Sequence, residues 1–223
     1  MNIVAVETSG DWCSVALWRD GHVDAREMEA GQKQSGLLID MLMALLTECG
    51  VTLKAIDGFA YGAGPGSFTG LRIACGVVQG LAMGVNRPVA GVGALLALAE
   101  ASGKSKVVCC VDARMKEVYH AAYEKCGADW RVVHEPGVYA PGDVPALAGE
   151  GWHGRGNAFS VYGEALRARY SSSVSSVDAA AYPHAREIAT LAAPVFARGD
   201  GVAPEHAAPQ YVRDRVALKI HER

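Results

Sequence analysis

The sequence lacks the paired cysteines and histidines that usually mark disulfide frameworks and metal sites. Its six cysteines form no C-x-x-C pair, and several lie in apolar runs where cysteine behaves as a small hydrophobic residue. Its seven histidines are never closer than fourteen residues, so no H-x-x-x-H or H-E-x-x-H pair exists. The sequence therefore predicts no metal site built on one helix, a reducing compartment, and histidines that are mostly at the surface.

A membrane span and a signal peptide are also missing from the pattern. The longest apolar run, residues 71–85, contains Arg72, Gln79 and glycines, and it falls short of the roughly 20 residues that a membrane span needs. The first apolar segment has no basic region before it and soon reaches Glu7, which argues against a signal peptide. We therefore expect a cytoplasmic protein with no membrane partner.

Strong basic charge is absent as well. The net charge is −3, so contact with a nucleic acid would require a local patch or a partner protein. The only basic cluster is the tail, which contains Arg213, Arg215, Lys219 and Arg223. A solvated chain end is the more ordinary explanation of such a tail than a phosphate contact.

What is present is a globular α/β pattern, with 50% hydrophobic and 20% charged residues. Three strands are expected at the start as an antiparallel meander, at residues 2–6, 13–18 and 23–28. Helices and strands then alternate, at residues 36–49, 56–61, 69–85, 89–92 and 94–101. This order predicts a mixed sheet with helices on its faces.

The strand pattern restarts after a short polar segment at residues 102–105. Strands are expected at residues 107–111 and 118–123, which indicates a second domain or a weak second copy of the first. We therefore divide the chain into an N-terminal unit, residues 1–104, and a C-terminal unit, residues 105–223. The pattern weakens after residue 126, apart from a helix expected at residues 183–198.

Two of the expected helices are apolar around their whole circumference. Between residues 37 and 46 the only polar residue is Asp40, and the second helix repeats glycine every fourth residue. Either both helices are buried in a two-domain core, or they pack against another subunit, which we favour. The expected interface residues are Leu38, Met41, Leu42, Leu45, Ile73, Gly76, Val77, Gly80, Leu81 and Gly84.

The segment YGAGPGSFTGLRIACGVVQGLAMG, residues 61–84, joins a glycine-rich turn to this second helix. A turn between a strand and a helix can bind phosphate, but this one lacks G-K-[ST] and does not fit G-x-G-x-x-G. Ser67 lacks the flanking glycines of a nucleophile elbow, and we expect Ser67 and Thr69 to cap the helix. Close packing is the favoured role of the motif Gly64, Pro65, Gly66, Ser67, Phe68, Thr69, Gly70 and Arg72.

Two carboxylates follow expected strands, Glu7 after the first and Asp112 after residues 107–111. In a two-domain nucleotide-binding fold, such positions could hold a metal–water cluster beneath phosphates. A turn-capping or salt-bridging role is the more ordinary expectation. Together with Thr8 and Ser9 they define at most a vestigial nucleotide site, and no cofactor is expected.

Several motifs together resemble one protein family. They are VETSG-x-x-CSVALW at the start, GPGSFTGLRIA and QGLA in the glycine segment, DAR and EVY at residues 112–119, and P-x-YVR at residues 209–213. This set resembles the TsaB (YeaZ) family of bacterial tRNA threonylcarbamoyladenosine biosynthesis proteins. The resemblance spans nearly the whole chain and implies an actin-like (ASKHA) fold of two related domains, each with a ribonuclease-H-like mixed sheet.

The resemblance also implies a non-catalytic role. In this family the protein assists its paralogue TsaD, which uses an H-x-x-x-H metal site to transfer the threonylcarbamoyl group from threonylcarbamoyl-AMP to the adenosine beside the tRNA anticodon, in tRNAs that read codons beginning with A. Ala94 and Leu98 stand here where those histidines would be. The implied partners are TsaD and the ATPase TsaE, with tRNA met through the complex and a homodimer when the chain is alone.

Two departures and two alternatives remain at this stage. The family often has Asp where this chain has Glu7, which argues further against independent nucleotide chemistry, and often has His where this chain has Gln34. An actin-like ATP-dependent phosphotransferase would use the strand-end carboxylates and the glycine turn. A peptidase ranks lowest because the sequence has neither metal ligands nor a nucleophile elbow.

Overall fold

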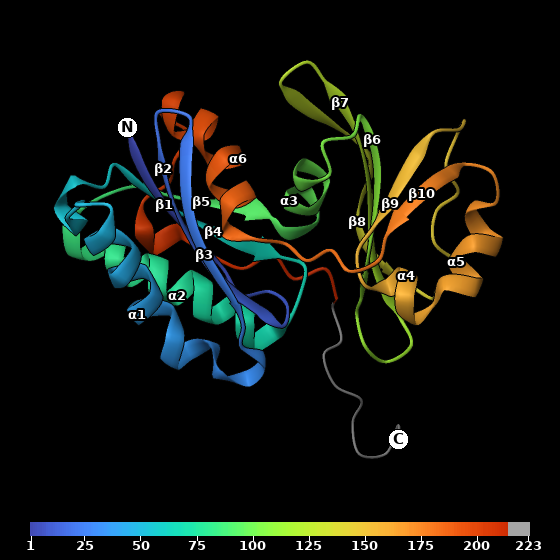
Figure 1. The fold of residues 1–223 in the computed structure, drawn as a ribbon, viewed down its shortest axis with the longest axis horizontal. Helices are drawn as coiled ribbons and strands as arrows, with labels where there is room; N and C mark the ends of the chain where they lie inside the picture. Colours follow the sequence, from blue (N-terminus) through green and yellow to red (C-terminus); the bar gives the residue numbers. More distant parts are fainter. Residues whose placement is uncertain (214–223) are drawn as a thin grey trace.

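The computed structural model describes residues 1–213 of the chain, which form two lobes, each built on one five-stranded sheet (Figure 1). The tail residues Arg215, Lys219 and Arg223 lie outside this range. Both sheets are mixed and carry helices on their faces, as the alternating sequence pattern predicts.

The first sheet has the strand order β3-β2-β1-β4-β5, with β1 at its centre. Its first three strands form the expected antiparallel meander, and β4 and β5 then add in parallel. The strands are β1 (Asn2–Glu7), β2 (Trp12–Arg19), β3 (His22–Glu29), β4 (Gly58–Gly64) and β5 (Val89–Gly93). The helices from this half are α1 (Gln34–Glu48), α2 (Phe68–Val85) and α3 (Ala94–Ala101).

The second sheet repeats the topology of the first, with the order β10-β9-β6-β7-β8. Strands β6, β7 and β8 form an antiparallel meander, and β9 and β10 add in parallel beside β6. The strands are β6 (Lys106–Asp112), β7 (Val118–Cys126), β8 (Asp129–Tyr139), β9 (Trp152–Arg155) and β10 (Val174–Asp178). β6 thus takes the place of β1, and Asp112 ends β6 as Glu7 ends β1.

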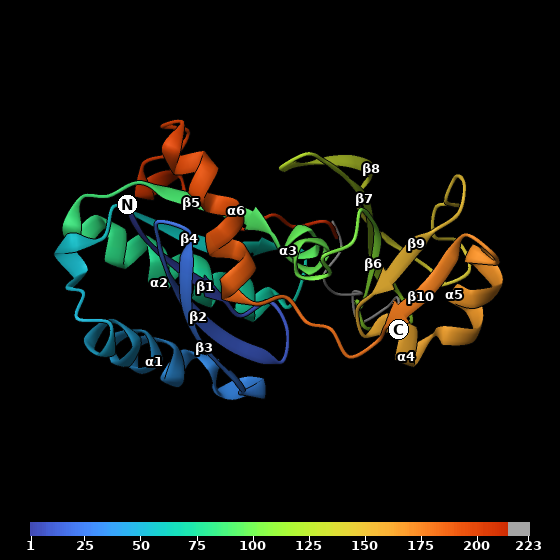
Figure 2. The ribbon, with the colours of Figure 1, turned by 45° about the horizontal axis from the view of Figure 1, so that its top comes forward.

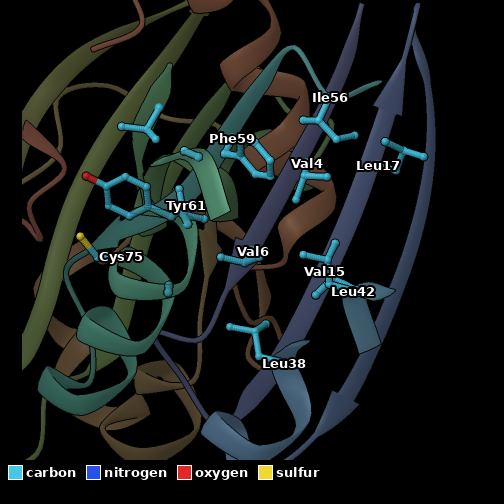
Figure 3. Packing of buried hydrophobic residues seen from close by; sticks show 14 of the residues in the cluster. Val4, Val6, Val15, Leu17, Leu38, Leu42, Ile56, Phe59, Tyr61 and Cys75 are labelled. Carbon is cyan, nitrogen blue, oxygen red and sulfur yellow. The ribbon is translucent and has the colours of Figure 1, made fainter. Parts of the chain in front are cut away.

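The first lobe buries both faces of its sheet. α1 and α2 cover one face, where Leu38 and Leu42 of α1 lie with Val6 and Val15 of the sheet in one apolar cluster (Figure 3). The opposite face is covered by α6 (Ala185–Ala197), which returns from the far end of the sequence. The division into domains at residue 104 therefore stays a prediction, because α6 follows the second sheet but packs on the first.

Helix α3 lies between the two lobes (Figure 2). Its residues Leu95 and Leu98 pack against Val107 and Cys109 of β6, while Ala97 packs with the first sheet and α6. The outer face of the second sheet is covered by the short helices α4 (Ala158–Val161) and α5 (Gly163–Tyr170). Burial of α3 on both sides fixes the two lobes to each other through apolar contact.

His120 of β7 corrects the expectation that the histidines are mostly exposed. Its ring is fully buried under Tyr139 and Tyr170, and neither ring nitrogen has a hydrogen-bond partner among residues 1–213. Burial, together with the neighbouring His134, lowers the pKa of His120 from 6.5 to about 3. A charged imidazolium is therefore not tolerated in this core.

We predict that acid destabilises the protein through His120. The unfolded chain binds this proton near pH 6.5, whereas the folded chain does not until about pH 3. The stability that His120 contributes is complete above pH 6.5 and falls below it by up to about 1.4 kcal/mol per pH unit, or about 2 kcal/mol at pH 5. The raised pKa of Glu7 acts in the opposite direction over this range, so the test compares the natural protein with His120→Phe, in which Glu7 is unchanged. Between pH 7 and pH 5 the difference in their free energies of unfolding, measured in urea, should shift by about 2 kcal/mol in favour of His120→Phe, and an unchanged difference would contradict the assignment.

Candidate functional site

The glycine-rich turn that follows β4 packs against the loop that follows β1. Gly62, Gly66 and Gly70 all face this loop. A Cβ atom added at any of the three would lie within 3 Å of the Glu7 carboxylate, the Ser9 carbonyl or the Thr8 carbonyl, respectively. Only glycine therefore permits this approach of two backbones.

Hydrogen bonds join the same two segments. The Ser67 amide donates to the Ser9 carbonyl at 2.7 Å, and the Thr8 hydroxyl donates to the Gly70 carbonyl at 2.7 Å. The Ser67 hydroxyl accepts from the Gly70 amide and caps α2 as expected, whereas Thr69 lies exposed within the first turn and does not cap. Two amides that a phosphate would need already have acceptors in the protein, which supports a packing role.

Glu7 lies beneath this turn and is fully buried. One carboxylate oxygen accepts the Ser9 amide, and the other has no partner among the described residues. Burial raises the pKa of Glu7 to about 7, although the hydrogen bonds with Ser9 and Thr8 oppose the rise. Because its side chain points at Gly62 and does not line the cleft between the lobes, Glu7 is poorly placed to bind a ligand there.

Asp112 occupies the equivalent strand end in the second lobe but has a different environment. Its carboxylate accepts from the Arg114 amide at 3.0 Å and from the Tyr162 hydroxyl at 3.1 Å, and it pairs with the Arg114 guanidinium. This matches the turn-capping and salt-bridging role that is the ordinary expectation for such a position. Of the four expected nucleotide-site residues, Ser9 and Asp112 line the cleft, whereas Glu7 and Thr8 do not.

The cleft lies between the lobes and has a volume of about 690 Å³. One wall is formed by residues 65–71 of the glycine turn, and the other by residues 111–115 of the second lobe. Residues 210–213 also line it and belong to what we call the C-terminal strap, residues 207–213. This strap carries the P-x-YVR motif, and the expectation of a solvated chain end is wrong for its Arg213, whose side chain is 16% exposed and paired with Glu117.

The C-terminal strap joins the two lobes. On the first lobe, the Gln210 amide donates to the Ala63 carbonyl at 2.8 Å, and Ala208 exchanges hydrogen bonds with the Tyr61 hydroxyl. On the second lobe, the Arg213 guanidinium donates to the Ala113 carbonyl at 3.0 Å and pairs with Glu117. The strap therefore ties β4 of the first lobe to the β6–β7 turn of the second.

The expected interface residues divide into two groups. Leu38, Leu42 and Leu45 are buried in the chain's own core, so they are not available at the surface. Met41, Ile73, Val77 and Leu81 are half-buried, and Gly76, Gly80 and Gly84 are exposed. Helical spacing explains the division, because residues 38, 42 and 45 share the stripe that faces the sheet.

Four large apolar side chains of these two helices are exposed. Ile39 and Met43 are exposed on α1, and Met83 and Phe68 are exposed on α2. None of these four is among the expected interface residues, because both helices are apolar on every side. These exposed residues can be identified only when it is known which side of each helix the sheet covers.

Helix α2 is the one helix among residues 1–213 that is long and apolar enough to cross a membrane by length and composition, a test that core helices of soluble proteins also pass. Only a third of its residues are buried within the protein. Two large apolar side chains of α2, Phe68 and Met83, are exposed together with three glycines.

No group of three or more metal-ligating side chains is brought together within the part of the chain that the structure describes. Ala94 and Leu98, which take the places of the two histidines, are buried on α3 and pack with the core. Burial raises the pKa of Cys13 to about 11 and that of Cys110 to about 12, so these thiols stay protonated near neutral pH.

Comparisons with known proteins give a consistent result. Residues 28–219 match the family model described as "TsaD: tRNA N6-adenosine threonylcarbamoyltransferase". The chain is 36% identical to the tRNA threonylcarbamoyladenosine biosynthesis protein TsaB of Escherichia coli, over 98% of this chain and 97% of that protein. It is 30% identical to the protein of the same name in Haemophilus influenzae, over 98% and 96% of the two chains.

A solved structure also matches over nearly its whole length. YeaZ from Pseudomonas aeruginosa superposes with a TM-score of 0.85 at 36% identity, covering 94% of this chain and 99% of that one. The expected actin-like fold of two ribonuclease-H-like sheets is confirmed by this match and by the repeated strand order.

We predict opposite effects from alanine at two glycines of α2. Gly70→Ala places a Cβ against the Thr8 carbonyl and should lower the free energy of unfolding by about 1–3 kcal/mol or more. Gly76→Ala meets open space and should raise it by about 0.5–1 kcal/mol, because alanine is the better helix former. Chemical denaturation measures both, and equal effects would contradict the packing role of the turn.

Proposed function

The chain belongs to the TsaB (YeaZ) family, within the wider TsaD family, and from this premise we propose that it is a non-catalytic subunit of the machinery that makes threonylcarbamoyladenosine in tRNA. Its proposed task is to bind a TsaD protein and so support transfer of the threonylcarbamoyl group to the adenosine beside the anticodon. In this proposal TsaE joins the complex, and tRNA is reached through it. The proposed location is the cytoplasm, with a homodimer when no TsaD is present.

The observation that carries this proposal is the uncovered surface of α2. Six of its 18 residues are buried and four more apolar residues are half-buried against the core, whereas Gly76, Gly80, Gly84 and Met83 are exposed on it. A Cβ placed at Gly76, Gly80 or Gly84 would meet nothing within 4 Å. Such a row of small residues lets another helix approach closely.

Helix α1 extends the same apolar surface. Ile39 and Met43 are exposed on it, and Met83 of α2 is 61% exposed. The two helices contact each other and cover the same face of the first sheet (Figure 1). Flexible methionines suit a contact surface that must adapt to a partner. These side chains, together with the glycines, replace Leu38, Leu42 and Leu45 in the proposed interface.

The arrangement of the carboxylates and amides around the cleft supports a non-catalytic role for this chain. Glu7 is buried beneath Gly62, and the Ser67 and Gly70 amides are already bonded within the protein. Asp112 is held by Arg114 and Tyr162. Neither carboxylate is arranged as the base or metal ligand that an actin-like phosphotransferase would require.

We predict that Gly80→Leu abolishes binding to the TsaD protein. The new side chain projects into open space in this chain but would stand where the partner's backbone must approach. Co-purification of tagged wild type and variant with TsaD measures the effect, and an unchanged melting temperature shows that the variant is folded. A Gly80→Leu protein that still co-purifies with TsaD would contradict the proposed interface.

Leu42→Glu is not a valid test of the same interface. Leu42 is fully buried against the sheet, so a carboxylate there would be desolvated without a partner. We expect this variant to unfold, and its loss of binding would say nothing about the surface. Met43→Glu, at an exposed position on the same helix, is the informative change.

A further inference from the structure

The turn between β6 and β7 has a left-handed backbone although it contains no glycine. Arg114, Met115 and Lys116 have φ angles of +60°, +53° and +61°. In residues other than glycine this conformation brings the Cβ atom too close to the following carbonyl oxygen, so three in succession store steric strain. All three residues are exposed, and burial of their side chains therefore does not offset the strain. Other contacts must hold the turn in this conformation.

Some of these contacts lie within the turn, and others come from the C-terminal strap. The Ala113 amide donates to the Glu117 carbonyl, and the Glu117 amide donates to the Arg114 carbonyl, both at 2.9 Å. From the strap, the Arg213 guanidinium donates to the Ala113 carbonyl at 3.0 Å and pairs with the Glu117 carboxylate. It also lies 3.8 Å from the Met115 sulfur. Arg213 therefore contacts both ends and the tip of the strained turn.

Arg213 is the anchor of the strap on the second lobe. Among the described residues, it supplies all the hydrogen bonds that join the strap to this lobe. Its guanidinium is mostly buried and lies 5.7 Å from the centre of the Tyr119 ring. Charge-assisted hydrogen bonds in such a partly desolvated place are stronger than exposed ones. A single side chain thus connects the strap to the strained turn.

The attachment of the strap to the first lobe is short. The Gln210 amide donates to the Ala63 carbonyl, and Ala208 exchanges hydrogen bonds with the Tyr61 hydroxyl. A Cβ atom added at Gly64 would lie 2.7 Å from the Gln210 carbonyl oxygen, so this glycine makes room for the strap. The strap itself belongs to no helix or strand. Because it has no ladder of backbone hydrogen bonds to break, the strap can detach from β4 as a short unit.

We propose that the C-terminal strap is a releasable latch across the cleft. In the latched state, which the structure shows, the strap runs from the first lobe to the second and Arg213 holds the β6–β7 turn in its left-handed conformation (Figure 1). In the released state the strap leaves β4, the turn relaxes to negative φ angles and the cleft opens. The strain in the turn lowers the free energy needed for release. This inference goes beyond the proposed function and does not depend on it.

A latch requires that a change on one lobe alters the other, because one strap serves both. Tyr61→Phe keeps the buried ring but removes the hydroxyl that bonds Ala208. It should speed hydrogen exchange of the Glu117 amide, in the second lobe, by about fivefold or more. Arg213→Ala should in turn speed exchange of the Gln210 amide, in the first lobe, by a similar factor. NMR of the full chain measures both rates.

The matched control is Arg198→Ala, which removes an arginine–carboxylate pair with Asp200 outside the strap and should leave both rates unchanged. The amides of Val4 and Val108, in the central strands of the two sheets, report unfolding of the whole protein and should be less affected. Faster exchange that is confined to the mutated lobe, or that Val4 and Val108 share equally, would overturn the proposal.

Lys116→Gly tests the contribution of the strain, because glycine adopts a positive φ without a steric cost and the Lys116 side chain is exposed. It should strengthen the latch and slow exchange of the Gln210 amide by about two- to fivefold. In Arg213→Ala, where the turn and the strap are uncoupled, it should not change this rate. An unchanged rate in the natural chain, or equal slowing in both backgrounds, would show that the turn is not part of the latch. None of these measurements involves TsaD, so the inference can fail while the proposed function stands.

Discussion

The position of α2 depends on the close approach of the glycine turn to the loop after β1. Gly62, Gly66 and Gly70 have no side chain that would hold this segment away from residues 7–9. The hydrogen bonds of Thr8 and Ser67 then fix the distance. Because α2 starts within this contact, the turn sets which side of the helix faces the sheet and which side faces outward. The orientation of α2 about its own axis therefore decides which of its residues are available to the proposed interface.

The same contact covers Glu7 at the end of β1. The two lobes repeat one topology, so Glu7 and Asp112 are equivalent in position, yet neither acts on the cleft as an unpaired group. Glu7 is covered by the glycine turn, and Asp112 is engaged by Arg114 and Tyr162. In the proposed function, this fold presents the outward sides of α1 and α2 to a partner.

Much of the fold was predictable because its patterns are local. The meander of the first lobe, α1, α2 and α3 were found near their observed bounds from periodicity and turn residues. Strands β8, β9 and β10 were missed because residues 126–176 carry many glycines, prolines and serines, and pairing with β6 and β7 overrides their weak propensity. The return of α6 to the first sheet is a non-local contact that no local pattern contains.

The sequence was enough to predict that the glycine turn packs closely, but not which residues of α1 lie at the surface. The glycine turn was predicted to pack closely, which the contacts of Gly66 with Ser9 and of Gly70 with Thr8 support. Leu38, Leu42 and Leu45 were assigned to an interface because α1 is apolar on every side, but they are buried. Pairing of Arg72 with Tyr211 joins residues 139 positions apart. Only the three-dimensional structure brings them together.

The central claim is that this chain contributes binding surface rather than chemistry. Reconstitution of tRNA modification with TsaD, TsaE, threonylcarbamoyl-AMP and a tRNA transcript tests it most directly, with modified adenosine scored by mass spectrometry. The account predicts that modification requires this chain alongside TsaD and TsaE, and that the chain alone transfers nothing. Full modification without this chain, or transfer by this chain alone, would contradict it.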